Sequence, residues 1–273
     1  MNSEEGPSTS FASSVAIASG KGGVGKSTVA VNVATVLAKD GAAVGLLDAD
    51  VYGPNCHIML GVDKLPPPRG KTIIPAVAHG IKLVSMGLLV GAQQPLAWRG
   101  PMLHSAIRQF VQDVDWGDLD FLIVDLPPGT GDAQLSVAQT LSLTGAFIVT
   151  LPQAVSVADA RRGLELFRQL QVPVLGVIEN MSYLSMPDGS QVDVFGQGGG
   201  SRLAEDAGVT FVGQIPLDPK VRVGGDTGEP IVVAHPESES AAALRQIAVT
   251  VCEKVVAQSR EKQVDSIPIE VIE

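Results

Sequence analysis

Residues 20–28 read Gly20-Lys21-Gly22-Gly23-Val24-Gly25-Lys26-Ser27-Thr28, and they follow the apolar run 15–18. This is the phosphate-binding loop pattern, in which glycines let backbone N–H groups converge on phosphate oxygens. Lys26 would place its charge at the β- and γ-phosphates, and the Ser27 hydroxyl would coordinate Mg²⁺. The largely apolar residues that follow predict a helix, whose N-terminal dipole would strengthen the anion site. We therefore expect all nine residues to line a site for a nucleoside triphosphate with Mg²⁺.

The loop carries a second lysine, Lys21, at a position where the general pattern accepts any residue. A solvated loop lysine would explain it in isolation. Together with Gly22, Gly23 and Lys26, however, it resembles the deviant Walker A loop of partition ATPases, division-site ATPases and the nitrogenase iron protein. That resemblance implies a nucleotide-sandwich homodimer, in which Lys21 reaches the partner subunit's nucleotide. Such a lysine would act as an arginine finger does, by bringing positive charge to the transferred phosphoryl group.

Aspartates follow two of the apolar, strand-like runs. Asp48 and Asp50 come after one run, and Asp125 ends another. The carboxyl ends of parallel strands face the ligand crevice of an α/β sheet, where Mg²⁺ must be held. Asp125 has the form of a Walker B carboxylate. We therefore expect the Mg²⁺ ligands to be Ser27, Asp48 and Asp125.

Hydrolysis requires a water in line with the γ-phosphate more than it requires a strong base. We expect Asp50 to position that water. Asp132 is the alternative, because it follows the proline- and glycine-rich loop 126–131, whose composition suits a segment that senses the γ-phosphate. The predicted catalytic residues are Lys21, Lys26, Asp50 and Asp125.

Asn180 is a candidate for recognition of the base. It follows the strand-like run 174–178, so it too is expected at the crevice. Its carboxamide offers both a donor and an acceptor to a purine edge. A capping or turn asparagine explains the same spacing equally well.

Composition limits the partners and the compartment. The net charge of −10 argues against nucleic acid or an anionic membrane as the main partner. No uninterrupted apolar run is long enough to span a bilayer. The chain has two cysteines, Cys56 and Cys252, and their spacing is not that of a metal site. We therefore expect a reduced, cytoplasmic protein.

Apolar runs alternate with helical patterns, which is typical of a three-layer α/β fold with a doubly wound, mainly parallel sheet. The predicted strands are 15–19, 42–47, 81–86, 120–125, 145–151, 173–179 and 209–215. The predicted helices are 26–39, 101–113, 132–141, 156–170, 199–207 and 238–259. No linker divides the interior, so we expect a single P-loop ATPase domain over 13–259. We expect 1–12 to form a disordered leader and 260–273 a C-terminal tail.

Motifs along the chain resemble the Mrp/ApbC branch of the deviant Walker A ATPases. Besides the loop at 20–28 they are Asp48-Ala49-Asp50-Val51-Tyr52-Gly53-Pro54, Trp98-Arg99-Gly100-Pro101-Met102, Asp125-Leu126-Pro127-Pro128-Gly129-Thr130-Gly131-Asp132, Glu179-Asn180-Met181-Ser182-Tyr183, Phe195-Gly196-Gln197-Gly198-Gly199-Gly200 and Gly213-Gln214-Ile215-Pro216-Leu217-Asp218. The resemblance covers nearly the whole chain. It implies ATP-dependent carrying and delivery of iron–sulfur clusters, with apo iron–sulfur proteins or assembly factors as partners. It also implies that Asn180, Pro216 and Asp218 surround adenine.

One segment departs from that branch. Its metal-binding members carry a Cys-x-x-Cys pair after Asn-Met-Ser-Tyr, and two pairs across the dimer supply four thiolates to one cluster. Here residues 184–190 contain no cysteine, and the turn sequence Pro187-Asp188-Gly189 predicts two short strands instead. A bound cluster would need other ligands. Cys56 is a candidate, and a buried, apolar Cys56 is the alternative.

Other functional classes share the phosphate-binding loop. A spatial-organisation ATPase like MinD or ParA needs a basic membrane-binding helix or a DNA-binding patch, and the segment 261–265 supplies neither. A reductase like the nitrogenase iron protein needs cluster cysteines where this chain has Pro127-Pro128-Gly129. The sequence thus favours an ATPase that is a carrier or scaffold in iron–sulfur protein maturation. A MinD/ParA-like switch without a cluster is the alternative.

Overall fold

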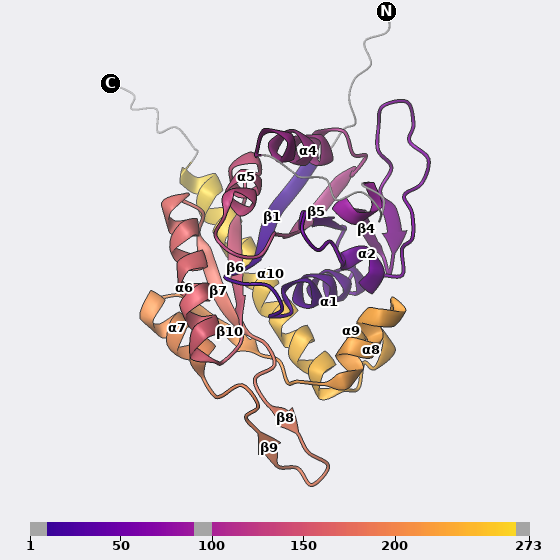
Figure 1. The fold of residues 1–273 in the computed structure, drawn as a ribbon. Helices are drawn as coiled ribbons and strands as arrows, with labels where there is room; N and C mark the ends of the chain where they lie inside the picture. The colour runs from indigo at the N-terminus through magenta and orange to yellow at the C-terminus, as the bar shows by residue number, and fades with distance from the viewer. Residues whose placement is uncertain (1–9, 90–99, 266–273) are drawn as a thin grey trace, which may run out of the picture.

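The computed structural model describes residues 10–89 and 100–265 of the chain. Eight strands form the main sheet: β1 (Ser10–Ser19), β2 (Val44–Asp48), β3 (Ala76–Ala78), β4 (Ile81–Ser85), β5 (Asp118–Asp125), β6 (Gly145–Thr150), β7 (Val174–Glu179) and β10 (Thr210–Gln214). Their order is β10-β7-β6-β1-β5-β2-β4-β3, so the first strand lies in the middle of the sheet (Figure 1). Every neighbouring pair is parallel except β3 with β4.

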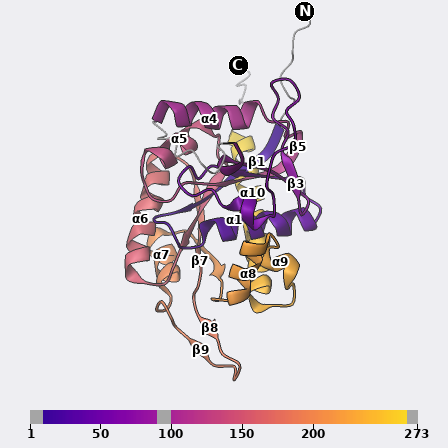
Figure 2. The same cartoon turned by 45° about the vertical axis from the view of Figure 1, so that its right-hand side comes forward.

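Helices cover both faces of this sheet (Figures 1 and 2). One face carries α1 (Lys26–Lys39), α2 (Cys56–Met59), α8 (Pro219–Thr227), α9 (Ile231–Ala234) and α10 (Glu239–Asp265). The other carries α3 (Met86–Leu89), α4 (Gly100–Gln112), α5 (Asp132–Thr140), α6 (Ala154–Gln169) and α7 (Gly199–Ala207). The predicted doubly wound, mainly parallel fold is therefore confirmed. Among the described helices, none is both long enough and apolar enough to cross a bilayer.

The central strands are apolar throughout because both of their faces are buried. In β1, Val15 and Ile17 belong to the core beneath α1 and α10, whereas Ala16 and Ala18 belong to the core beneath α5 and α6. All four side chains are completely buried. Successive side chains of a strand point to opposite faces, so a two-sided core requires an unbroken apolar run.

The predicted elements all have counterparts, and the differences lie mainly at the ends of the chain. β1 begins at Ser10, inside the predicted leader, because Ser10 pairs in register with Asp118 of β5. α10 continues to Asp265, inside the predicted tail. Residues 1–9 and 266–273 lie outside the described part.

The prediction missed β3 and the short helices α2, α3, α8 and α9. Short elements show too little periodicity to be recognised from the pattern alone. The start of α8 did carry a signal, because Asp218 caps it by accepting from the Lys220 N–H at 2.8 Å and Pro219 is its first residue.

A two-stranded hairpin projects from the body of the molecule (Figure 1). It consists of β8 (Leu184–Ser185) and β9 (Gln191–Val192), which are the two short strands predicted on either side of Pro187-Asp188-Gly189. Glu239 of α10 holds its base. The Tyr183 hydroxyl donates to Glu239 Oε1 at 2.9 Å, and the Ser185 hydroxyl donates to Oε2 at 2.7 Å.

Candidate functional site

The carboxyl ends of β1, β2 and β5 meet because these strands are neighbours and parallel. Asp48 of β2 lies opposite Asp125 of β5, and Ile17 of β1 lies opposite Asp125 on its other side. The phosphate-binding loop leaves β1 after Ser19 and enters α1 at Lys26. The loop and the predicted carboxylates therefore lie together at one edge of the sheet.

Glycine is required at two positions of the loop. At Gly20 a β-carbon would lie 2.0 Å from the carbonyl carbon of Asp159 in α6. Gly25 has a φ of +82°, and a β-carbon there would lie 2.1 Å from Asn180 Nδ2. That same Nδ2 donates to the Val24 carbonyl at 2.8 Å. A side chain at either glycine would displace the loop.

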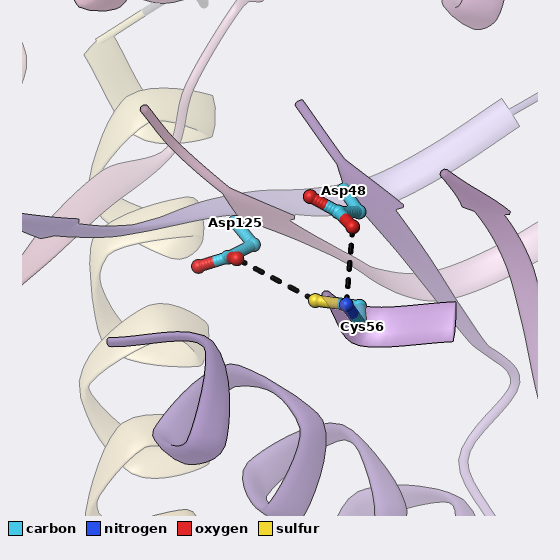
Figure 3. A group of neighbouring side chains, drawn as sticks. All are labelled: Asp48, Cys56 and Asp125. Carbon is cyan, nitrogen blue, oxygen red and sulfur yellow. Dashed lines mark hydrogen bonds between the residues drawn. The ribbon is translucent and has the colours of Figure 1, made fainter. Parts of the chain in front are cut away.

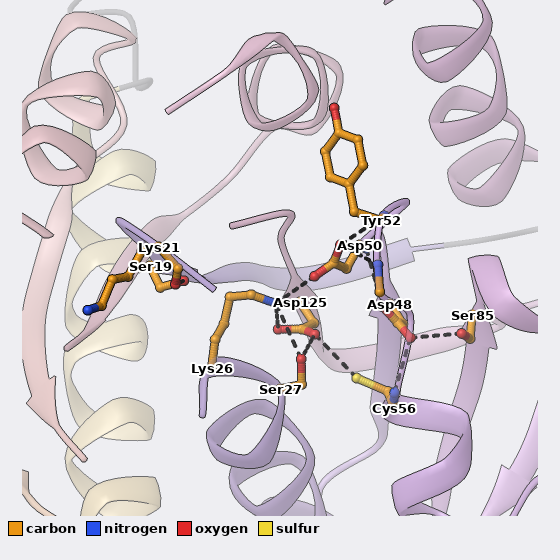
Figure 4. A network of polar contacts seen from close by, with 11 residues as sticks. Ser19, Lys21, Lys26, Ser27, Asp48, Asp50, Tyr52, Cys56, Ser85 and Asp125 are labelled. Atoms are coloured by element: carbon orange, nitrogen blue, oxygen red, sulfur yellow. Dashed lines mark hydrogen bonds and ion pairs between the residues drawn. The ribbon is translucent and has the colours of Figure 1, made fainter. Parts of the chain in front are cut away.

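Lys26 is buried, and its ammonium contacts two carboxylates (Figure 4). Nζ lies 2.6 Å from Asp125 Oδ1 and 3.6 Å from Asp50 Oδ2. Burial alone lowers the pKa of Lys26, but the neighbouring charges of Asp125 and Asp50 outweigh it, and the pKa is raised. Lys26 is thus a permanent positive charge at the floor of the site.

Ser27 and Asp125 fit the predicted Mg²⁺ role. The Ser27 hydroxyl donates to Asp125 Oδ2 at 2.5 Å, so the two oxygens already adjoin. Mg²⁺ in nucleotide sites takes hard oxygen ligands, commonly one or two from the protein and the rest from phosphates and water. The hydroxyl of Ser27 at the start of α1 and the carboxylate of Asp125 at the end of β5 are such ligands.

Asp48 lies beside Asp125 at the predicted edge of the sheet, and hydrogen bonds within the protein surround its carboxylate. Its Oδ2 accepts from the Ser85 hydroxyl at 2.8 Å and from the Cys56 N–H at 3.1 Å, and its Oδ1 accepts from the Asp50 N–H at 3.2 Å. Burial, followed by the charge on Asp125, raises the pKa of Asp48 to about 7. These three bonds leave the carboxylate of Asp48 one further acceptor position, so its role as a Mg²⁺ ligand stays a prediction.

Asp50 borders the phosphate-binding loop, as predicted. Its Oδ1 accepts from the N–H groups of Tyr52 at 3.1 Å and Gly53 at 3.2 Å, so the chain turns around this carboxylate. Its Oδ2 is the oxygen that faces Lys26. The Tyr52 ring points away from the site and is 74% exposed (Figure 4).

Lys21 borders the same site, but its side chain points away from Lys26 and Asp125 (Figure 4). Its carbonyl accepts from the Ser19 hydroxyl at 2.9 Å. No carboxylate among the described residues forms an ion pair with its ammonium. An amine directed out of its own site is what the cross-dimer prediction requires.

Two adjoining cavities run along this edge of the sheet. The smaller, of about 260 Å³, is bordered by the phosphate-binding loop and Asp50. The larger, of about 430 Å³, contains the three residues predicted around adenine: Asn180, Pro216 and Asp218. The wall that both cavities share is formed by Thr28, Asn55, Met59 and Met181. The phosphate-binding loop thus lies at the first cavity and the residues predicted around adenine at the second, in the order that the prediction requires.

Cys56 begins α2 between Asp48 and Asp125, and the ligand atoms of the three lie within 4.8 Å of one another (Figure 3). Its side chain is fully buried, and Sγ donates to Asp125 Oδ2 at 3.5 Å. Burial, and then the charges of the two carboxylates, raises the pKa of this thiol well above its usual range. A buried, neutral thiol is a poor cluster ligand, because the thiolate is the form that binds metal. This geometry favours the alternative interpretation, a buried packing cysteine.

Folded protein is expected to react with a thiol reagent such as dithionitrobenzoate at Cys252 alone. Cys252 is partly exposed on α10, whereas Cys56 is buried and should react only after unfolding. A Cys252→Ser variant should therefore show no reactive thiol until denaturant is added. Rapid labelling of that variant in its folded state would contradict the burial of Cys56 and restore it as a candidate cluster ligand.

Some predicted residues lie outside what the structure describes, and one bonding partner was missed. The side chain of Asp132 is not described, nor are Trp98 and Arg99, so the second candidate for positioning water stays a prediction. The missed residue is Ser85, which bonds Asp48. Ser85 ends β4, so the strand-end rule that found the aspartates would also have found this serine.

Comparisons with known proteins agree with this geometry. Residues 10–252 match the family model described as ParA: NUBPL iron-transfer P-loop NTPase. The chain is 56% identical over 248 residues to the iron–sulfur cluster carrier protein of Synechocystis sp., and the match covers 88% of this chain and 70% of the relative.

Solved structures show the same fold. A nucleotide-binding protein from Archaeoglobus fulgidus in complex with ADP has a TM-score of 0.73 at 36% identity, covering 84% of this chain and 90% of that one. The septum site-determining protein MinD of Pyrococcus horikoshii, complexed with Mg-ADP, has a TM-score of 0.68 at 22% identity, covering 91% of this chain and 99% of that one. At that identity the second likeness concerns the fold alone.

Proposed function

The chain belongs to the family of NUBPL iron-transfer P-loop NTPases, and on this premise we propose that it is a dimeric, ATP-hydrolysing carrier or scaffold for iron–sulfur clusters. The resemblance to the Mrp/ApbC branch is thereby confirmed. The observation that carries the proposal is the convergence of Lys26, Ser27 and Asp125 in a chain whose 56%-identical relative is named an iron–sulfur cluster carrier protein. The clients would be apo iron–sulfur proteins or assembly factors, and the location would be the cytoplasm, in keeping with the low cysteine content.

ATP would place its triphosphate in the smaller cavity and its base in the larger. The Lys26 ammonium would leave Asp125 and contact phosphate oxygens instead, because it cannot make its shortest contact with both groups at once. That exchange frees Asp125, beside Ser27, to hold Mg²⁺, which when bound neutralises phosphate charge. Asn180 Nδ2 already donates to Val24, so its Oδ1 is left to accept from the exocyclic amine of adenine.

Hydrolysis would depend on Asp50 and on a second subunit. The N–H groups that hold Asp50 Oδ1 fix its carboxylate beside the phosphate cavity, where it would orient the attacking water. Asp48 would act through Asp50, because it braces the same loop. Lys21 of the partner subunit would stabilise the charge that develops on the transferred phosphoryl group.

The cargo would be held differently from the way a Cys-x-x-Cys pair holds it. Each chain has two cysteines, of which Cys56 is buried and Cys252 lies on α10. The hairpin 184–192, where the pair would stand, contains no cysteine. A four-thiolate cluster would therefore need ligands from a client protein or from small thiols. We propose a transient complex, in which the ATP state of the dimer governs handover to the client.

The experiment that tests this function is an anaerobic transfer assay. The protein is incubated with equal amounts of ferrous and ferric iron, sulfide and glutathione, and then with the apo form of a [4Fe–4S] enzyme whose activity reports cluster insertion. We expect colourless protein after aerobic purification, and MgATP-dependent activation of the client above the rate with glutathione alone. A Gln139→Leu variant is a control for substitution as such, because Gln139 is exposed on α5, and it should activate the client at the wild-type rate.

The two halves of the proposal can fail separately. ATP turnover without any effect on client activation would contradict the carrier or scaffold role and favour the nucleotide switch. Absence of ATP binding would contradict the proposal as a whole. A stable brown cluster in protein purified in air would show that the ligand argument has missed the true site.

A further inference from the structure

Gln134 is the one buried side chain in the described part of the chain whose nitrogen and oxygen have no hydrogen-bond partner. It is only 1% exposed, and both Nε2 and Oε1 are left unbonded. A buried polar group without a partner destabilises the state that contains it, so native structures rarely keep one without a reason.

Packing gives no reason for a glutamine here. Val137 and Ala138 stand three and four residues further along α5, on the same stripe of the helix, and both are buried in the core. An apolar side chain of similar size would fill the same space without the unbonded amide. A conformation in which the amide finds a partner would give the reason.

The position of Gln134 in its helix points to that conformation. α5 begins at Asp132 with Gly131 as its N-cap, so Gln134 is the third helical residue. A glutamine at this position can accept a hydrogen bond from the backbone N–H of the N-cap residue, which is one half of a capping box. Gly131 has no side chain to supply the other half. Gln134 Oε1, which could accept from the Gly131 N–H one turn earlier, thus has no hydrogen-bond partner in the described structure.

The loop that ends at Gly131 borders the phosphate cavity. It leaves β5 after Asp125, and Pro128 lines the cavity. The Gly129 N–H donates to the Ser19 carbonyl at 3.0 Å, which ties the loop to the start of the phosphate-binding loop. A change in this loop around bound nucleotide would therefore move Gly131 relative to Gln134.

We propose that Gln134 is a positioning residue, whose Oε1 accepts from the Gly131 N–H when the loop 126–131 closes on bound nucleotide. This inference rests on the proposed ATP cycle. In this proposal the described arrangement, with its unbonded amide, is the open state, and the amide favours closure because it is bonded only in the closed state. Gln134 touches neither the nucleotide nor the ion, and it acts through the loop that borders them.

The test compares Gln134→Leu with two other variants. Leucine keeps the approximate volume and removes the amide. Gln134→Glu keeps an oxygen at the same place and is the conservative rescue, since glutamate also serves at this capping position. Gln139→Leu is the matched control, because Gln139 is exposed on the same helix. The readouts are the Tm without nucleotide, the Tm increase with a non-hydrolysable ATP analogue and Mg²⁺, and kcat and KM for ATP.

Gln134→Leu should raise the nucleotide-free Tm by about 2–4 °C, because an unbonded amide is removed. It should shrink the Tm increase caused by the analogue and lower kcat about tenfold, with KM changed less than about threefold. Gln134→Glu should keep kcat within about threefold of wild type and lower the nucleotide-free Tm, since a carboxyl buried there is less tolerable than an amide. Gln139→Leu should match wild type in every readout.

A lower nucleotide-free Tm for Gln134→Leu would overturn the proposal, because the amide would then be bonded in the open state. An unchanged kcat and analogue shift in that variant would overturn it as well. The nucleotide-free Tm does not depend on ATP, and wild-type turnover is measured alongside. Failure of this inference is thus distinguishable from failure of the proposed function.

Discussion

Lys26→Ala is expected to abolish ATP binding at micromolar protein concentrations. The ammonium of Lys26 lies 2.6 Å from Asp125 and 3.6 Å from Asp50, and alanine leaves both carboxylates facing the triphosphate. Truncating one partner of a buried, hydrogen-bonded charge pair at a binding site costs about 2–5 kcal/mol, which is roughly thirtyfold or more in Kd. Isothermal calorimetry with MgATP measures the loss directly.

The same missing charge also destabilises the empty fold, so loss of binding must be separated from loss of structure. Circular dichroism and a melting curve establish that the variant is folded, and Lys26→Met retains more of the buried stem if alanine is not tolerated. Lys21→Ala removes the same charge from the same loop, yet Lys21 contacts no carboxylate of its own site among the described residues. It should bind ATP within about threefold of wild type. Unchanged affinity in folded Lys26→Ala would remove the basis of the predicted ATP site.

The carboxylates of the site could be predicted from the sequence because the ends of apolar strands can be recognised there. Asp48, Asp50 and Asp125 each follow an apolar run, and the structure brings all three to the edge of the sheet where Lys26 lies. The hydrogen-bond partners of each carboxylate could not be predicted from the sequence. Asp48 braces its loop through Ser85, and that contact depends on β4 lying beside β2, a neighbour relation that no local pattern specifies.

Cys56 and Gln134 are two further residues whose surroundings could not be predicted from the sequence. Cys56 is enclosed because α2 folds over the carboxylates, and a helix of four residues has no periodicity to detect. Gln134 looks like an ordinary polar residue of a helix, and its N-cap is a glycine rather than the serine or threonine that marks a capping box. Burial, which makes both residues unusual, is a property of the packed molecule.

Asp50→Ala and Lys21→Ala are each expected to bind ATP and to lose turnover. Asp50 would orient the water, and a cation brought to the phosphoryl group by a neighbouring subunit is worth about 10³-fold or more in related reactions. We expect kcat to fall at least about a hundredfold in each variant, with little change in ATP affinity by calorimetry. Without turnover, Asp50→Ala should also accumulate as an ATP-bound dimer, which sedimentation with and without MgATP would detect.

Mixing these two inactive variants should restore activity, because the proposed site takes Asp50 from one subunit and Lys21 from the other. In a mixed dimer, the site in the Lys21→Ala subunit keeps its own Asp50 and receives Lys21 from its Asp50→Ala partner, whereas the other site lacks both. Random pairing of equal amounts makes half the dimers mixed, each with one working site, so about a quarter of wild-type activity is expected. If Lys21 served its own site, both sites of the mixed dimer would be defective. Absence of recovery in a mixture shown to exchange subunits would therefore disprove the cross-dimer role of Lys21.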